Sequence, residues 1–257
     1  MDKELEMKVA KLQELVDSSD NIVFFGGAGV STESGIPDFR SRDGLYNQKY
    51  DFPPETILSH SFFMRNTAEF YRFYKEKILL VGSDMDPKPN AAHLKLAELE
   101  QVGKLKAVIT QNIDELHHKA GSKTIYELHG TVTRNYCMDC DKEFNVEYIK
   151  NSGDVPVCDA CGGIVKPDVV LYEEGLDMYT MEQAIKAISE ADMLIIGGTS
   201  LVVYPAAGLI DYYRGNKLVL INKGTTGREA GADLVINGPI GEVLGAIKGY
   251  CSDSSAH

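Results

Sequence analysis

A glycine-rich loop directly follows a short apolar run, and this pair constrains the fold more than any other feature of the chain. Residues 22–25, Ile-Val-Phe-Phe, have the length and residue types of a buried parallel strand. A glycine-rich turn after such a strand brings backbone N–H groups close to a phosphate. The usual dinucleotide fingerprint needs a glycine where this chain has Thr32, and Pro37 prevents a long helix. The sequence therefore predicts a phosphate-binding loop of an unusual kind.

Apolar runs of the same type recur and alternate with stretches of helical spacing. The expected strands are residues 22–25, 107–110, 125–128, 169–172, 193–196, 218–221 and 234–236. The expected helices are residues 3–18, 60–80, 90–100, 179–190, 204–214 and 240–249. Alternation of strand and helix predicts an α/β fold, in which a Rossmann-like parallel sheet is covered by helices on both faces.

Polar clusters occur where several of these strands end. They are Gly26 to Ser31, Gln111 to Asp114, His129, Gly197 to Ser200, and Asn222. Each cluster alone could be a helix cap or a turn. Ligands of parallel sheets, however, bind beyond the carboxyl ends of the strands. Together the clusters predict one binding crevice along that edge.

Two close pairs of cysteines indicate a metal site. Cys137 and Cys140 form one C-x2-C pair, Cys158 and Cys161 form the other, and 17 residues separate the pairs. This spacing is typical of a four-thiolate zinc ribbon. With sulfur at all four positions no site remains for water, so the zinc is expected to be structural. The rival interpretation is a nucleic-acid-binding ribbon, and the acidic residues around the pairs count against it.

Charge and hydropathy narrow the class of protein. The chain has 257 residues and a formal net charge of −12, which argues against direct nucleic-acid binding. No apolar run approaches the roughly 18 residues of a membrane span. The N-terminal residues lack the positive start and apolar stretch of a signal peptide. We therefore expect a cytoplasmic protein that does not bind membranes.

The motifs occur in an order that identifies a family. Gly-Ala-Gly-Val-Ser, Ser-Gly-Ile-Pro-Asp-Phe-Arg, Thr-Gln-Asn-Ile-Asp, His-Gly, the paired cysteines and Gly-Thr-Ser follow one another along the chain. In this the chain resembles the sirtuins, NAD-dependent protein-lysine deacylases, and above all their compact bacterial members. The resemblance spans roughly residues 5–245.

The resemblance implies a role for each matching residue. His129 is the expected general base, and Asn112 is expected to order the ribose or a water molecule beside it. The residues expected to contact NAD are Ala28, Gly29, Ser31, Thr32, Phe39, Arg40, Gln111, Ile113, Asp114, His129, Thr199, Ser200, Asn222 and Ile240. The four cysteines are the expected ligands of one structural zinc ion.

The resemblance also implies the reaction. Departure of nicotinamide lets the acyl oxygen of the substrate lysine attack the sugar, and His129 takes a proton from a ribose hydroxyl. The products are free lysine and O-acyl-ADP-ribose, so NAD is consumed. We expect acetyl-lysine proteins or peptides as substrates and a monomeric enzyme. Residues 1–40, 84–130 and 167–257 would form the NAD-binding domain, 41–83 a helical insertion of a small domain, and 131–166 the zinc module.

Two positions depart from the family pattern. The family has Phe-Gly-Glu where this chain has Tyr172-Glu173-Glu174, although Val170, Tyr172, Val202 and Val203 still match the segments between which a peptide inserts as a strand. Members that remove succinyl groups carry an arginine three residues after the tyrosine that corresponds to Tyr71, where this chain has Tyr74. Without that arginine a carboxylate on the acyl chain has no partner, so neutral acyl groups are expected.

The sequence leaves three questions open: the role of the aromatic stripe, the reaction that the site performs, and whether the protein is catalytic. The aromatic stripe of residues 60–80 could be core packing or an acyl groove. The same site could transfer ADP-ribose to protein, or could remove neutral acyl groups other than acetyl. A non-catalytic NAD sensor is a further alternative, which the presence of His129, Asn112 and Asp114 disfavours.

Overall fold

A parallel six-stranded sheet forms the larger part of the molecule. The computed structural model describes residues 3–38 and 52–250. The strand order is β3-β2-β1-β7-β8-β9, and every neighbouring pair is parallel. In that order the strands are Ile125–Glu127, Leu105–Thr110, Ile22–Gly26, Met193–Gly197, Leu218–Asn222 and Leu234–Asn237. The predicted Rossmann-like parallel sheet is confirmed.

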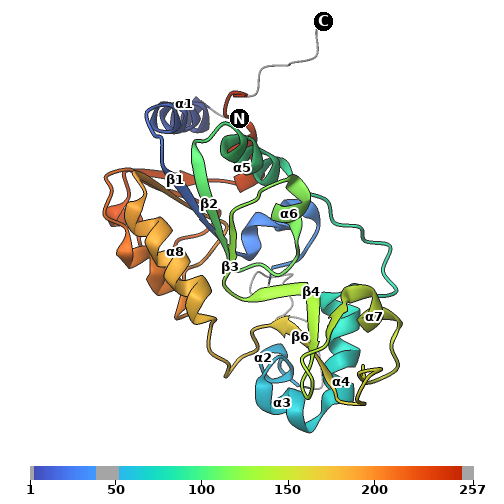
Figure 1. Cartoon of the computed structure of the whole chain (residues 1–257). Helices are drawn as coiled ribbons and strands as arrows, with labels where there is room; N and C mark the ends of the chain where they lie inside the picture. The colour runs from blue at the N-terminus through green and yellow to red at the C-terminus, as the bar shows by residue number, and fades with distance from the viewer. Residues whose placement is uncertain (1–2, 39–51, 251–257) are drawn as a thin grey trace, which may run out of the picture.

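Helices cover both faces of the parallel sheet (Figure 1). Alternate side chains of a strand point to opposite faces, and so to opposite layers of helices. In β1, Phe24 packs in one core cluster, and Val23 and Phe25 pack in the other. The first cluster is covered by α1 (Lys3–Asp17), α5 (Ala91–Gln101) and α9 (Ile240–Gly245). The second is covered by α8 (Met178–Glu190) and the 3₁₀ helix η5 (Ala206–Tyr212). Because both faces are buried, the strands are continuously apolar.

A second, antiparallel sheet has three strands in the order β5-β4-β6. The strands are β5 (Glu143–Asn145), β4 (Gly130–Cys137) and β6 (Val165–Val169). The prediction that residues 169–172 form a strand of the parallel sheet is therefore wrong. Val169 ends β6 and pairs with Gly130, while Tyr172 forms an isolated bridge to Ser59. A short apolar run specifies burial, but long-range pairing decides which sheet it joins.

Short helices pack on this second sheet around an aromatic cluster (Figure 1). They are α2 (Pro54–Ile57), α3 (His60–Arg65), α4 (Thr67–Phe73), the π-helix η4 (Tyr74–Ile78) and α7 (Val146–Asn151). The helix expected over residues 60–80 is thus divided at Asn66. Phe62, Phe63, Phe70, Tyr71 and Tyr74 are all buried, as expected for core packing. Among the described residues no helix is long and apolar enough to cross a membrane.

Candidate functional site

The glycine-rich loop lies against the end of β7. It consists of two 3₁₀ turns, η1 (Ala28–Val30) and η2 (Thr32–Ser34), after β1. The N–H of Gly29 donates to the carbonyl oxygen of Gly198 at 2.8 Å. A Cβ on Gly29 would lie 2.8 Å from the Cα of Gly198, and a Cβ on Gly198 would lie 2.4 Å from the nitrogen of Val30. This close approach of two backbones requires glycine on both sides.

Side chains from the loop and from the end of β2 form one hydrogen-bonded group. The Ser31 hydroxyl donates to Oδ2 of Asp114 at 2.6 Å, and Nδ2 of Asn112 donates to the Ser31 oxygen at 3.1 Å. The other carboxylate oxygen of Asp114 accepts the N–H of Leu116, the first residue of α6 (Leu116–Ala120), at 3.0 Å. Burial raises the pKa of Asp114, and the bonds from Ser31 and Leu116 oppose that rise.

Gln111 connects the ends of three strands. Its backbone N–H donates to the carbonyl of Gly26, the last residue of β1, at 3.0 Å. Its side-chain Nε2 donates to the hydroxyl of Thr199, after β7, at 3.2 Å. Gln111 itself follows β2. The structure thus brings the predicted polar ends of β1, β2 and β7 together.

His129 lies between the two sheets, after β3 and directly before β4. Its Nδ1 donates to the carbonyl oxygen of Gln111 at 3.0 Å, since a carbonyl can only accept. That bond fixes the tautomer in which Nε2 carries the lone pair. Burial lowers the pKa of His129, and the bond to Gln111 opposes this effect. The imidazole is therefore neutral near pH 7 and can accept a proton at Nε2.

The other predicted NAD contacts occupy the glycine-rich loop, the segment after β7, the end of β8 and the start of α9. Ser200 is exposed, and the side chain of Asn222 donates to the carbonyl of Gly224 at 2.9 Å. Ile240 is buried at the start of α9, where a Cβ on Gly197 would lie 2.2 Å from its Cδ1. Ala28 begins the first turn of the loop, and the hydroxyl of Thr32 donates to the Gly29 carbonyl at 3.0 Å. Phe39 and Arg40 lie outside the described residues.

Asn90, the first residue of the helix expected over residues 90–100, also belongs to this region. Its Oδ1 accepts the N–H of Ala92 in the first turn of α5. Its Nδ2 donates to the carbonyl of Val30 at 2.7 Å and to the hydroxyl of Ser34 at 3.0 Å. Asn90 therefore links the glycine-rich loop to the first turn of α5. No local signal predicts this second role, because the loop lies far away in the sequence.

The segment of Val170 and Tyr172, which is predicted to pair with a peptide, is hydrogen-bonded to His129. The N–H of Val170 donates to the carbonyl of His129 at 3.0 Å. Tyr172 and Val202 expose 38% and 56% of their surface, so both are available to a partner. Val203 is half-buried.

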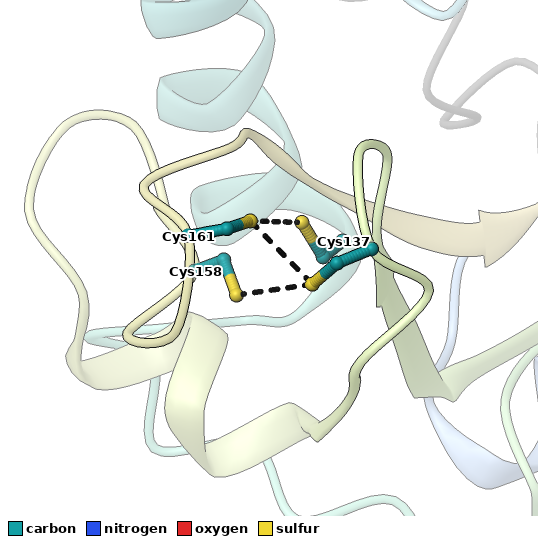
Figure 2. A group of neighbouring side chains, drawn as sticks. Cys137, Cys158 and Cys161 are labelled. Carbon is teal, nitrogen blue, oxygen red and sulfur yellow. Dashed lines mark hydrogen bonds between the residues drawn. The ribbon is translucent and has the colours of Figure 1, made fainter.

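The four cysteines converge on one point in the second sheet, as Figure 2 shows for Cys137, Cys158 and Cys161. The sulfur of Cys161 lies 3.4 Å from those of Cys137 and Cys140, and the sulfurs of Cys140 and Cys158 are 3.7 Å apart. A tetrahedral zinc ion with Zn–S bonds of about 2.3 Å places its sulfurs roughly 3.8 Å apart. The spacing therefore fits four thiolates around zinc.

Backbone groups complete this zinc site. The N–H of Asp139 donates to the sulfur of Cys137, and the N–H of Ala160 donates to that of Cys158, both at 3.4 Å. Burial raises the pKa of the Cys158 thiol, but hydrogen bonds from the backbone at Ala160 and Cys161 outweigh it and lower that pKa to about 7. Cys137 and Cys158 are buried in the aromatic cluster, whereas Cys140 and Cys161 are exposed. A bound zinc ion would therefore link the two exposed cysteines to the two that are buried in the aromatic cluster.

Glu115, His118 and Glu127 form a second group whose ligand atoms could meet one ion. Both carboxylates already have partners. Glu115 accepts the hydroxyls of Thr131 and Thr133, and Glu127 accepts Nη2 of Arg134 at 3.1 Å. These bonds account for the group without a metal.

Comparisons with known proteins agree on one family. The model of the Sir2 family matches residues 27–205. The NAD-dependent protein deacetylase of Clostridium acetobutylicum is 61% identical over 240 residues, which cover 92% of this chain and 96% of the relative. A Sir2 structure with a deacetylated p53 peptide and 3′-O-acetyl ADP ribose superposes with a TM-score of 0.84 at 42% identity. A Sir2 structure with a p53 peptide and NAD⁺ gives 0.81 at 43%, and each superposition covers 93% of this chain and 96% of the other.

Proposed function

The chain belongs to the Sir2 family and is an NAD-dependent protein deacetylase, in which we propose that His129 acts as the general base. It transfers the acetyl group of an acetyl-lysine substrate to ADP-ribose and releases nicotinamide. One observation carries the role of His129: its Nδ1 donates to the Gln111 carbonyl, which leaves Nε2 free to accept a proton. Burial lowers the pKa of His129, so the ring is in the basic form at neutral pH.

We infer that the group around Ser31 and Gln111 binds NAD. NAD supplies a cationic leaving group and the ribose that receives the acetyl group. The carboxylate of Asp114, held by Ser31, is an acceptor for an amide such as the nicotinamide carboxamide. The amide of Gln111 and the hydroxyl of Thr199 are suited to ribose hydroxyls and phosphates. The glycine-rich loop lies beyond the carboxyl ends of β1 and β7, where parallel sheets bind such ligands.

We infer that the substrate peptide runs along Val170 and Tyr172 on one side and Val202 and Val203 on the other. The bond from Val170 to the carbonyl of His129 supports this path, since it places the strand beside the base. The apolar aromatic surroundings of Tyr74, where an arginine would be needed for acidic acyl chains, support a preference for neutral acyl groups.

We propose that residues 1–40, 84–130 and 167–257 form the NAD-binding domain, that 41–83 are a helical insertion, and that 131–166 are a zinc module. The two sheets and their separate core clusters support this division. The four clustered cysteines must stay reduced to bind zinc, which is typical of a reducing compartment. We therefore propose that the enzyme is cytoplasmic. We propose that it acts as a monomer.

Incubation with NAD and acetyl-lysine peptides tests the proposal, with products identified by mass. We expect deacetylated peptide, nicotinamide and O-acetyl-ADP-ribose in equal amounts. In the His129→Ala variant kcat should fall by about 10² to 10⁴, the contribution typical of a positioned base. The variant should keep its affinity for NAD, which separates loss of the base from loss of the fold. ADP-ribosylated peptide as the product, or NAD binding without turnover, would reject the deacetylase.

The pH profile of kcat/KM tests the protonation state of His129. A base acts only when deprotonated, so activity should be constant at neutral pH and fall as the pH drops through the pKa of His129. Because burial lowers that pKa, the midpoint of the acid limb should lie below the ordinary histidine value of 6.5. An acid limb centred above 6.5 would contradict the assignment.

A further inference from the structure

The tight turn from Leu171 to Glu174 has a glutamate where glycine is ordinarily needed. The N–H of Glu174 donates to the carbonyl of Leu171 at 3.1 Å, which closes the turn. Glu173 is its third residue and has a φ of +78°. A φ near +80° at this position defines a type II turn and strongly favours glycine, because a Cβ makes it strained. The turn is therefore retained without the residue type that normally permits it.

The side chain of Glu173 provides a reason for this exception. Its Oε2 accepts the backbone N–H of Ser61 at 2.8 Å, in the first turn of α3. The first N–H groups of a helix have no partner within the helix, so this carboxylate caps one of them. The bond lowers the pKa of Glu173, as expected for a carboxylate stabilised in its charged form. A glycine could make the turn but could not cap α3.

Further bonds join the same two segments. The N–H of Tyr172 donates to the carbonyl of Leu58 at 3.0 Å, and the N–H of His60 donates to the carbonyl of Tyr172 at 2.9 Å. Glu174 contacts Nδ1 of His60 at 2.9 Å and accepts the N–H of Leu171 at 2.8 Å. Residues 171–174 are thus fastened to the beginning of α3.

The opposite end of this segment is fastened to the base. Val170 donates its N–H to the carbonyl of His129, and Leu171 is buried in the aromatic cluster. Tyr172 lies between these two attachments, with its side chain exposed and its backbone bonded to Leu58 and His60. The cap that Glu173 provides at Ser61 adds to those two bonds in holding the edge at Tyr172.

We propose that Glu173 is a positioning residue, which holds the turn 171–174 against α3 and thereby sets the affinity for acetylated peptides. The proposal rests on the proposed peptide path along Val170 and Tyr172. It predicts that Glu173 affects peptide binding but not NAD binding, because its contacts lie on the side of α3 and not at the glycine-rich loop.

Two variants test the side chain while keeping the backbone strain. Glu173→Ala keeps the Cβ, and with it the strain, but removes the cap, whereas Glu173→Gln keeps an oxygen that can accept the Ser61 N–H. Loss of one cap corresponds to about a fivefold change in an equilibrium constant. We expect Glu173→Ala to raise the peptide Kd and KM about fivefold, with the NAD KM and kcat unchanged. Glu173→Gln should stay within about twofold of the wild type.

Hydrogen exchange at the Ser61 amide gives a readout that does not depend on activity. That amide should be protected in the wild type and in Glu173→Gln, and should exchange rapidly in Glu173→Ala. An unchanged peptide Kd in Glu173→Ala, or a Ser61 amide that stays protected there, overturns the proposal. If the wild type binds peptide but releases no acetyl group, the deacetylase assignment fails while the Kd series still decides the role of Glu173. Glu182→Ala, on the exposed surface of α8, serves as the control.

Discussion

Tyr71 and Tyr74 lie three residues apart in the aromatic cluster but differ in hydrogen bonding. Both side chains are buried, and burial raises the pKa of each phenol. The hydroxyl of Tyr71 donates to the carbonyl of Val165 on β6. The hydroxyl of Tyr74 makes no hydrogen bond with the described residues. A buried polar group without a partner costs about 1–3 kcal/mol, whereas a made bond contributes about 1 kcal/mol.

The two tyrosines therefore predict opposite effects of the same substitution. Tyr74→Phe should raise the free energy of unfolding by about 1 kcal/mol, because it removes an unpaired hydroxyl. Tyr71→Phe should lower it by about 1–2 kcal/mol, because the Val165 carbonyl loses its donor. Urea denaturation of both variants checks the prediction, with equal m-values showing that the unfolded states match. Destabilisation by both substitutions would mean that a bound water serves the Tyr74 hydroxyl.

At the scale of residues, motif spacing predicted much of the site. The cysteine spacing predicted that four sulfurs lie close together, and the polar ends of the strands predicted the group around Gln111. The hydrogen bond from the Ser61 N–H to the Glu173 carboxylate could not be predicted, since these residues lie far apart in the sequence. The missing glycine was visible in the sequence, but only the fold shows the partner that accommodates a glutamate there.

Arg134 connects three strands around His129. On β4, its Nε donates to Oδ2 of Asp168 on β6 at 2.9 Å, and its Nη2 donates to Glu127 at the end of β3 at 3.1 Å. His129 follows Glu127 by two residues. Burial raises the pKa of Glu127, and the neighbouring Arg134 opposes that rise. Arg134 therefore opposes protonation of this half-buried carboxylate and links the two sheets beside His129, the proposed base.

We expect Arg134→Ala to lower kcat/KM about tenfold, because His129 loses a constraint on its position. The free energy of unfolding should fall by about 2–3 kcal/mol, since the half-buried Glu127 loses its charged hydrogen-bond partner. Arg134→Lys should recover part of both losses through one hydrogen bond, although it cannot bridge two carboxylates. Steady-state kinetics and urea denaturation measure the two effects. Wild-type kcat/KM in Arg134→Ala would show that His129 is held independently of this bridge.

At the scale of elements, the buried strands of the parallel sheet were predictable because both their faces are apolar. The second sheet was not, because β4 has few apolar residues, β5 has only 3 residues, and both border the cysteine pairs. Residues 169–172 show the limit of such patterns. Their apolar run predicted a buried strand, but Gly130 determines the pairing: its φ is +71° and a Cβ there would lie 1.9 Å from the Asp168 carbonyl. This close approach of Gly130 to Asp168 exists only in the folded chain, so the sequence pattern could not predict it.

The whole molecule consists of two parts (Figure 1), whose hydrophobic clusters are separate. His129 lies where the chain passes from one part to the other, between β3 and β4. The clusters on the two faces of the parallel sheet contain none of the four zinc-ligand cysteines. The third cluster contains Cys137 and Cys158 together with Val169 and Leu171 beside the proposed peptide path. The order of strands and the position of this second core depend on long-range pairing, which no window of sequence contains.

This separation predicts what removal of zinc does. Binding of a structural zinc ion is worth about 10–16 kcal/mol in small zinc peptides, so its loss should unfold the second core. Peptide turnover should disappear with the chelated ion. Segments of the parallel sheet should keep most of their hydrogen-exchange protection, because no cysteine ligand lies in their clusters.

Hydrogen exchange resolved by segment, before and after chelation, measures the predicted difference between β1 and β4. Cys140→Ser provides the matched genetic test, since this ligand is exposed and its loss leaves no cavity in the core. Added zinc should restore turnover to the chelated wild type but not to Cys140→Ser. If β1 loses protection together with β4, the two cores fold as one unit. If turnover survives without zinc, the aromatic cluster alone holds the peptide-binding segment in place.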